Sequence, residues 1–380
     1  MPLRDMLTNS WAHIQGCLFP WLAEELGPLM ECHRRLITVL EVACIEAFIR
    51  TWPGMAGRPP ADRHSLARAF VAKAVLGLPQ TNMLIERLQI DKTLRRLCGW
   101  PHAGEVPSEA TFSRAFAEFA ASELPQRMHE ALIERTLGGA HLVGHISRDS
   151  TAIEAREKPA KVEKPQAGER RRRRGRPRKG EVVPPKVPRR LEQQTTMTLS
   201  EMLADLPTHC AVGTKRNAKG HTTSWIGYKL HIDTADGDIP VTVLLTSASL
   251  HDSQVAIPLA TMTAARVANL YDLMDSAYDA PQITAHSRAL GHVPIIDHHT
   301  RRGEKTAIET EARAKRRAGY RLAEDVRYDQ RSSAERVNSN LKDNCGGNFV
   351  RVRGAPKVFC HLMFGILIIA VEQLMRLAPP

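Results

Sequence analysis

The chain has 380 residues, of which 43% are hydrophobic and 25% charged, and this composition excludes fibrous, collagenous and fully disordered proteins. Lys and Arg number 53 against 41 Asp and Glu, which gives a net charge of +12. The seven scattered cysteines include no Cys-x-x-Cys pair, which argues against a disulfide framework or a zinc ribbon. The start of the chain lacks a leader pattern, and the longest apolar run, residues 358–371, is too short for a membrane span. We therefore expect a cytoplasmic protein with no membrane partner.

Most of the positive charge lies in a basic insert at about residues 156–190. This segment holds fifteen basic and four acidic residues, together with six prolines and few large apolar residues. Such a composition buries too little surface to offset the entropy of ordering, so we predict a disordered loop. Its centre resembles the Arg-Gly-Arg-Pro core of AT-hook peptides, which implies that Arg174, Arg176 and Arg178 bind DNA in a narrow minor groove. A solvated linker or a localisation tract is the alternative, but clustered arginines favour phosphate binding.

Residues 1–140 show a helical pattern. Apolar residues recur at three-to-four spacing over 36–47, 66–76 and 84–97, with Pro and Gly between these stretches. Pro107 and Ser108 predict the start of another helix, with Arg114 exposed one turn later. The region could be a helix-turn-helix that reads a DNA groove or a helical bundle used for dimerisation. We predict an all-helical N-terminal domain for DNA binding or dimerisation.

Residues 141–380 carry the pattern of a mixed α/β domain. A strand over 146–153 alternates in character, and two further alternating runs surround an Asp-Gly turn at 236–237, which predicts a β-hairpin. The remaining predicted elements are a helix over 253–264, strands over 270–274 and 292–296, a helix around Glu335 and a final apolar helix over 358–374. We expect this last helix to pack against the α/β domain.

Three acidic residues occupy positions from which they could converge. Asp149 lies on the first strand, Asp275 at the carboxyl end of a later strand, and Glu335 on a helix. Carboxylates from separate elements, without Cys or His, suit Mg²⁺, which prefers hard oxygen ligands and keeps positions open for water and phosphate. Two such ions can assist an in-line displacement at phosphorus. By themselves, three carboxylates among 41 acidic residues are a weak signal.

The residues around Glu335 strengthen the signal. Tyr328, Arg331, Glu335 and Lys342 lie at successive offsets of 3, 4 and 7, so on one helix they would share a stripe about 60° wide. A solvated stripe with an Arg331–Glu335 ion pair is the alternative, and it would contribute roughly a few tenths of a kcal/mol. The spacing resembles the Tyr-(2)-Arg-(3)-Glu-(6)-Lys signature of a branch of bacterial insertion-sequence transposases with DDE catalytic triads.

The resemblance extends over most of the chain. Residues 148–155 are similar to the strand that carries the first Asp in this family, 225–231 to its hairpin, and 246–253 to the segment after the hairpin. Residues 275–279 resemble the second-Asp motif, Asp-x-Gly-Tyr-Asp, with Ala277 where Gly is usual. This departure leaves Asp279 as an alternative to Asp275, which is preferred because it ends a strand. The helical region through Arg114 also resembles the amino-terminal domain of the family.

The resemblance implies a fold and an activity. The fold is a ribonuclease-H-like mixed sheet flanked by helices, preceded by the all-α domain. The activity is metal-dependent cleavage at the ends of an insertion sequence and strand transfer into target DNA. Asp149, Asp275 and Glu335 would hold Mg²⁺, or Mn²⁺ as a substitute, while Arg331 and Lys342 contact phosphates and Tyr328 packs on the DNA backbone.

The same resemblance implies partners and leaves two other functions open. The partners are double-stranded DNA, as terminal inverted repeats and as target, and a second copy of the chain in a homodimer on DNA. We expect the protein at the nucleoid. The alternatives are a catalytically inactive, transposase-derived DNA-binding protein and a structure-selective nuclease on the same fold. The intact triad and four-residue signature argue against decay.

Overall fold

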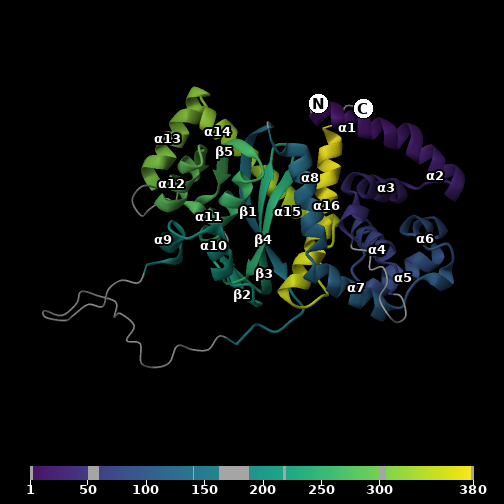
Figure 1. Cartoon of the computed structure of the whole chain (residues 1–380). Helices are drawn as coiled ribbons and strands as arrows, with labels where there is room; N and C mark the ends of the chain where they lie inside the picture. Colours follow the sequence, from purple (N-terminus) through teal and green to yellow (C-terminus); the bar gives the residue numbers. More distant parts are fainter. Residues whose placement is uncertain are drawn as a thin grey trace.

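The computed structural model describes residues 3–49, 60–139, 141–161, 188–216, 220–298 and 305–377, with the side chains of 305–308 left out. The centre of the basic insert, with Arg174, Arg176 and Arg178, lies outside the described residues. Figure 1 shows a group of N-terminal helices on one side of a central sheet and further helices on its other side.

The N-terminal region is all-helical, as predicted from its periodicity. Asp62 caps one of these helices, because its carboxylate accepts hydrogen bonds from the backbone amides of His64 and Ser65. The predicted helix over 84–97 is in fact two, since Asp91 interrupts it and caps the second. The helices are α1 (Leu3–His13), α2 (Phe19–Leu26), α3 (Glu31–Ala43), α4 (Arg63–Val75), α5 (Thr81–Ile90), α6 (Lys92–Cys98), α7 (Glu109–Ala121) and α8 (Leu124–Leu137).

A six-stranded mixed sheet forms the centre of the second region. Strand β1 pairs antiparallel with β3 on one side and parallel with β5 on the other, β6 pairs parallel with β5, and β4 completes the antiparallel hairpin with β3. This arrangement is the predicted ribonuclease-H-like sheet. The strands are β1 (Leu142–Glu154), β2 (Ala211–Arg216), β3 (Thr222–Ala235), β4 (Ile239–Ser247), β5 (Ala268–Met274) and β6 (Val293–Ile296).

Strand β2 escaped the sequence prediction, and one glycine explains how it joins the sheet. Residues 222–227 of strand β3 pair with β2, and from Gly227 onward the strand pairs with β1 and β4. Gly227 has φ of 151°, and a Cβ there would lie 2.1 Å from the carbonyl oxygen of Ile153. Only glycine fits so close to the β1 backbone.

Helices cover both faces of the sheet. They are α9 (Arg190–Gln194), α10 (Leu199–Asp205), α11 (Ala256–Ala264), α12 (Pro281–Ala289), α13 (Lys305–Ala318), α14 (Ala323–Tyr328), α15 (Ser332–Asn344) and α16 (Ala355–Arg376). Helix α15 crosses β1 and β3, which places its residues beside the centre of the first strand. The predicted single helix through Tyr328 and Lys342 is broken, because a 3₁₀ turn over Asp329–Arg331 separates α14 from α15.

The final helix, α16, lies between the sheet and the N-terminal helices (Figure 1). It contacts β4 and α15 on one side, as predicted, and also α3, α4, α7 and α8 on the other. A single hydrophobic cluster therefore runs from the N-terminal helices through α16 to the sheet, and the proposed domain boundary near residue 140 stays a prediction. Helix α16 is long and apolar enough to cross a membrane, but most of it is buried, as in a core helix.

Candidate active site

Asp149 lies near the centre of β1, beside Ile232 of β3 and under helix α15. The side-chain amide of Asn338, on α15, donates a hydrogen bond to Oδ2 of Asp149 over 3.0 Å. Burial raises the pKa of Asp149 from 3.8 to about 6, and the charge of Asp275 adds to this increase. Arg331 and Lys215 oppose it, because cations favour the carboxylate. The structure therefore holds a carboxylate here at a considerable electrostatic cost.

Asp275 directly follows β5, which pairs in parallel with β1. The last paired residues of the two strands are Arg148 and Met274, and the residues that follow them are Asp149 and Asp275. Neighbouring strands lie about 4.8 Å apart, which explains why the two carboxylates influence each other. The carboxylate of Asp275 accepts a hydrogen bond from the amide of Ala277 over 2.9 Å, and burial raises its pKa. Asp279, the alternative, is ion-paired with His298 over 3.2 Å.

Glu335 lies in the first turn of α15 and is exposed. Its carboxylate accepts a hydrogen bond from the Arg331 guanidinium over 2.6 Å, and Arg331 in turn lies 5.7 Å from the centre of the Tyr328 ring. The Arg331–Glu335 ion pair, which was expected if these residues form only a solvated polar stripe, is thus present. Arg331 also lowers the pKa of Asp149 and of Asp275, so its positive charge stabilises the ionised form of all three predicted carboxylates.

Lys342, two turns beyond Glu335, is half-buried near the same strand. Burial and the neighbouring Lys215 lower the pKa of its ammonium group, while Glu154, Asp343 and Asp149 act in the opposite direction. Lys215, on β2, is exposed and lowers the pKa of both Asp149 and Asp275. Strand β2, which the sequence did not predict, thus brings Lys215 to the carboxylates. No motif in the sequence had indicated this cation.

Asp252 is a fourth carboxylate near the site. It accepts a hydrogen bond from Lys229 over 2.9 Å and another from the side chain of Ser150, and its charge raises the pKa of Asp275. Asp252 belongs to the segment 246–253 and Lys229 to the hairpin, both of which matched the family pattern without an assigned role. The only signal for them in the sequence was that resemblance.

The opposite face of β1 carries a buried ion pair. Arg148 is 1% exposed, and its guanidinium donates two hydrogen bonds to Asp233 of β3, over 2.8 and 2.6 Å. Asp233 also accepts a hydrogen bond from Thr263 on α11 over 2.6 Å. This bidentate pair fixes β1 against β3 one residue before Asp149. It therefore positions the strand that carries the first carboxylate.

The carboxylates fit a divalent cation in part. Asp149 and Asp275 are adjacent oxygen donors whose pKa values are raised, as expected of a pair that lacks enough positive charge. The carboxylate of Glu335 is ion-paired with Arg331. Across the residues that the structure describes, no three His, Cys, Asp or Glu side chains are grouped closely enough to hold a metal. A metal site formed by all three predicted residues requires the Glu335 side chain to move closer to Asp149 and Asp275.

Family models match the chain in two places. Residues 24–118 match a model described as a transposase domain, and residues 144–371 match the transposase DDE domain. No curated protein and no solved structure gives a significant match. The second match runs from β1 into α16, includes all of the predicted catalytic residues and spans more than half of the chain. The chain therefore belongs to the transposase DDE domain family and has the function of an insertion-sequence DNA transposase.

Proposed function

We propose that this transposase cleaves DNA at the ends of its element and joins the freed 3′ ends to target DNA, with Asp149, Asp275 and Glu335 as the metal-binding carboxylates. The observation that carries the proposal is the adjacency of Asp149 and Asp275 at the β1–β5 register. Burial raises the pKa of Asp149 to about 6, and the charge of Asp275 adds to this increase. Surplus negative charge in a half-buried position is the condition under which a bound cation contributes most.

The family generally uses a divalent metal ion, and we propose Mg²⁺, with Mn²⁺ as a substitute. Bound there, the ion would supply Lewis-acid stabilisation of the attacking and leaving oxygens. Asp149 and Asp275 are the residues placed to hold it. The hydrogen bond from Asn338 to Oδ2 helps to fix the rotamer of Asp149. Glu335 would join them when DNA draws Arg331 away.

The cations of the site have a matching role in our proposal. A phosphate competes with Glu335 for Arg331, because both are anions and the guanidinium can bind either. Arg331 and Lys342 would contact phosphates beside the cleaved bond, and Tyr328, on which Arg331 stacks, would pack on the DNA backbone. DNA binding itself would thereby release Glu335. The Tyr-Arg-Glu-Lys spacing that defines the proposed branch of the family would then reflect this exchange.

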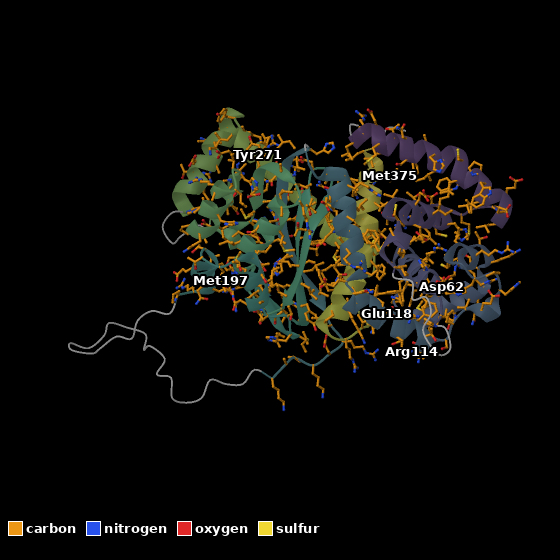
Figure 2. All side chains as sticks on the ribbon, viewed as in Figure 1. Asp62, Arg114, Glu118, Met197, Tyr271 and Met375 are labelled. Carbon is orange, nitrogen blue, oxygen red and sulfur yellow. The ribbon has the colours of Figure 1, made fainter. Side chains whose placement is uncertain are left out.

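The proposal extends to the partners. Terminal inverted repeats and target DNA are the substrates, and two element ends must be brought together for transposition, which favours a homodimer on DNA. The exposed Arg114 on α7 lies at the lower edge of the N-terminal helices in Figure 2. This edge is available to DNA or to a second protomer. We place the protein in the cytoplasm, at the nucleoid.

A cleavage assay tests the proposal. Labelled duplexes that carry the ends of the element are incubated with the full chain and Mg²⁺ or Mn²⁺, and nicked and joined products are separated. Wild type should nick and join, while Asp149→Asn, Asp275→Asn and Glu335→Gln should bind DNA and lose at least a hundredfold in rate, roughly the scale of electrostatic catalysis. Asp279→Asn is the matched control and should retain activity. Cleavage by Asp149→Asn, or nicks without joined strands, would contradict the assignment.

A further inference from the structure

A second cluster of cations lies outside the carboxylate site, in a cavity of about 470 Å³ between the N-terminal helices and the catalytic region. The cavity is lined by α4, α5 and α7 on one side, and by the ends of β1 and α15 and the start of α16 on the other. Five cationic side chains line it, against a single acidic one, Glu109: Lys73, Arg156, Arg351, Arg353 and Lys357.

These five cations lack carboxylate partners. None of them forms an ion pair within 4.0 Å in the described part of the chain, although many other arginines of the protein do. Arg353 donates to the carbonyl oxygen of Arg156 over 3.1 Å, and Lys73 donates to that of Pro79 over a long 3.4 Å. Convergent positive charge with a single acidic neighbour, Glu109, is a feature of anion-binding sites.

Lys73 is the strongest sign of a ligand. It is only 8% exposed, and burial lowers its pKa from 10.5 to about 8. A buried ammonium group without an anion is costly, and a bound anion would offset that cost. The first residues of α5, Gln80 to Asn82, line the same cavity, and the amides at a helix N-terminus also favour an anion.

The position of the cavity indicates which anion it binds. Arg156 lies two residues beyond the end of β1, the strand of Asp149, and Gly346 lies two residues beyond α15, the helix of Glu335 and Lys342. From Glu335 to Asn344, α15 rises about 14 Å, at 1.5 Å per residue. Duplex DNA rises about 3.4 Å per base pair, so this length corresponds to about four base pairs. Lys342 lies on α15 between Glu335 and the end of the helix beside the cavity.

We propose that this cationic cavity binds a backbone phosphate of duplex DNA about four base pairs from the cleaved bond. The inference rests on the proposed function, in which cleavage takes place at Asp149 and Asp275. It adds a clamp: because the cavity draws residues from both regions, DNA held there is fixed to the N-terminal helices and to the catalytic sheet together. The bond to be cut is thus set at a defined distance from an anchored phosphate.

Salt-dependent binding of the full chain to a short duplex tests the clamp. Arg351 is exposed and Lys357 partly so, and neither side chain forms a hydrogen bond or ion pair with another described residue. The double variant Arg351→Gln/Lys357→Gln should therefore fold normally by circular dichroism. If both contact phosphate, the log–log salt slope should fall in magnitude by about 1.8, and affinity near 0.1 M salt should drop by roughly 10- to 100-fold. The control Lys92→Gln/Arg96→Gln removes the same charge from exposed positions on α6 and should keep the slope.

A neutral-phosphate scan locates the contact. Duplexes with one methylphosphonate at successive positions should bind wild type most weakly when the replaced phosphate faces the cavity, and the Arg351/Lys357 double variant should be insensitive there. Three outcomes would overturn the proposal: an unchanged salt slope in the Arg351/Lys357 double variant, an equal loss of affinity in the Lys92/Arg96 control, or a loss of affinity for an RNA duplex alone. The two proposals fail separately. If the double variant shows the reduced salt slope but wild type cleaves no DNA, the catalytic assignment is refuted and the clamp is supported.

Discussion

The raised pKa of Asp149 predicts that removal of its charge stabilises the folded protein at neutral pH. Its pKa is about 6 when folded, against an ordinary value of 3.8. Because the folded state binds the proton more tightly, the contribution of Asp149 to stability is highest below pH 3.8 and falls as the pH rises through 6. At 1.36 kcal/mol per unit, ionised Asp149 costs the folded state about 3 kcal/mol at pH 7.5 and about 1 kcal/mol at pH 4.5.

Asp149→Asn keeps the shape of the side chain and an oxygen that accepts from Asn338, while it removes the charge. Urea unfolding of both proteins at pH 4.5 and 7.5 should show the variant gaining about 2 kcal/mol on wild type between the two values. Groups that do not interact with Asp149 titrate equally in both proteins, so their contributions cancel. Added Mg²⁺ should raise the midpoint of wild type at pH 7.5 and leave that of the variant unchanged, because a ligand of the folded state stabilises it.

The matched control is Glu324→Gln on α14, which removes the same charge from an exposed side chain. Its stability relative to wild type should not change between the two pH values. If Asp149→Asn shows the same pH-independent difference as this control, then Asp149 is well solvated in its ionised form. The argument from burial and from the neighbouring Asp275 would then be refuted, together with the inference that the pair needs a cation.

Three further predictions concern the surroundings of Asp149. Arg331→Gln should shift the acidic limb of the cleavage rate to higher pH, since Arg331 lowers the pKa of Asp149; an unchanged pH profile would contradict this. Arg148→Met should lower the free energy of unfolding by about 3–5 kcal/mol, measured in urea, because it leaves Asp233 buried without its cation, and the double variant with Asp233→Leu should regain much of the loss. Deletion of residues 162–187 should leave the thermal unfolding transition intact and reduce the salt slope by about 0.9 for each lost phosphate contact, whereas equal slopes would show that the insert does not touch DNA.

The sequence by itself determined the elements that local pattern controls. Alternation predicted β1, the β3–β4 hairpin and β5, because a strand with one buried face repeats every two residues. The three-to-four periodicity predicted the helical N-terminal region, and a long apolar run predicted the final helix. The spacing from Tyr328 to Lys342 indicated the family, since chemistry that needs a carboxylate between two cations constrains their offsets on a helix.

Only the tertiary structure decided how these elements meet. The parallel register of β1 and β5 places Asp149 beside Asp275 across 126 residues of chain, and no local signal encodes that pairing. Strand β2, too short and polar to be recognised, brings Lys215 to the site. Helix α16 joins the two regions because its apolar surface extends around more than one face, so burial requires neighbours on both sides. The cationic cavity has the same origin: its five cations belong to segments that become adjacent only when this shared core closes.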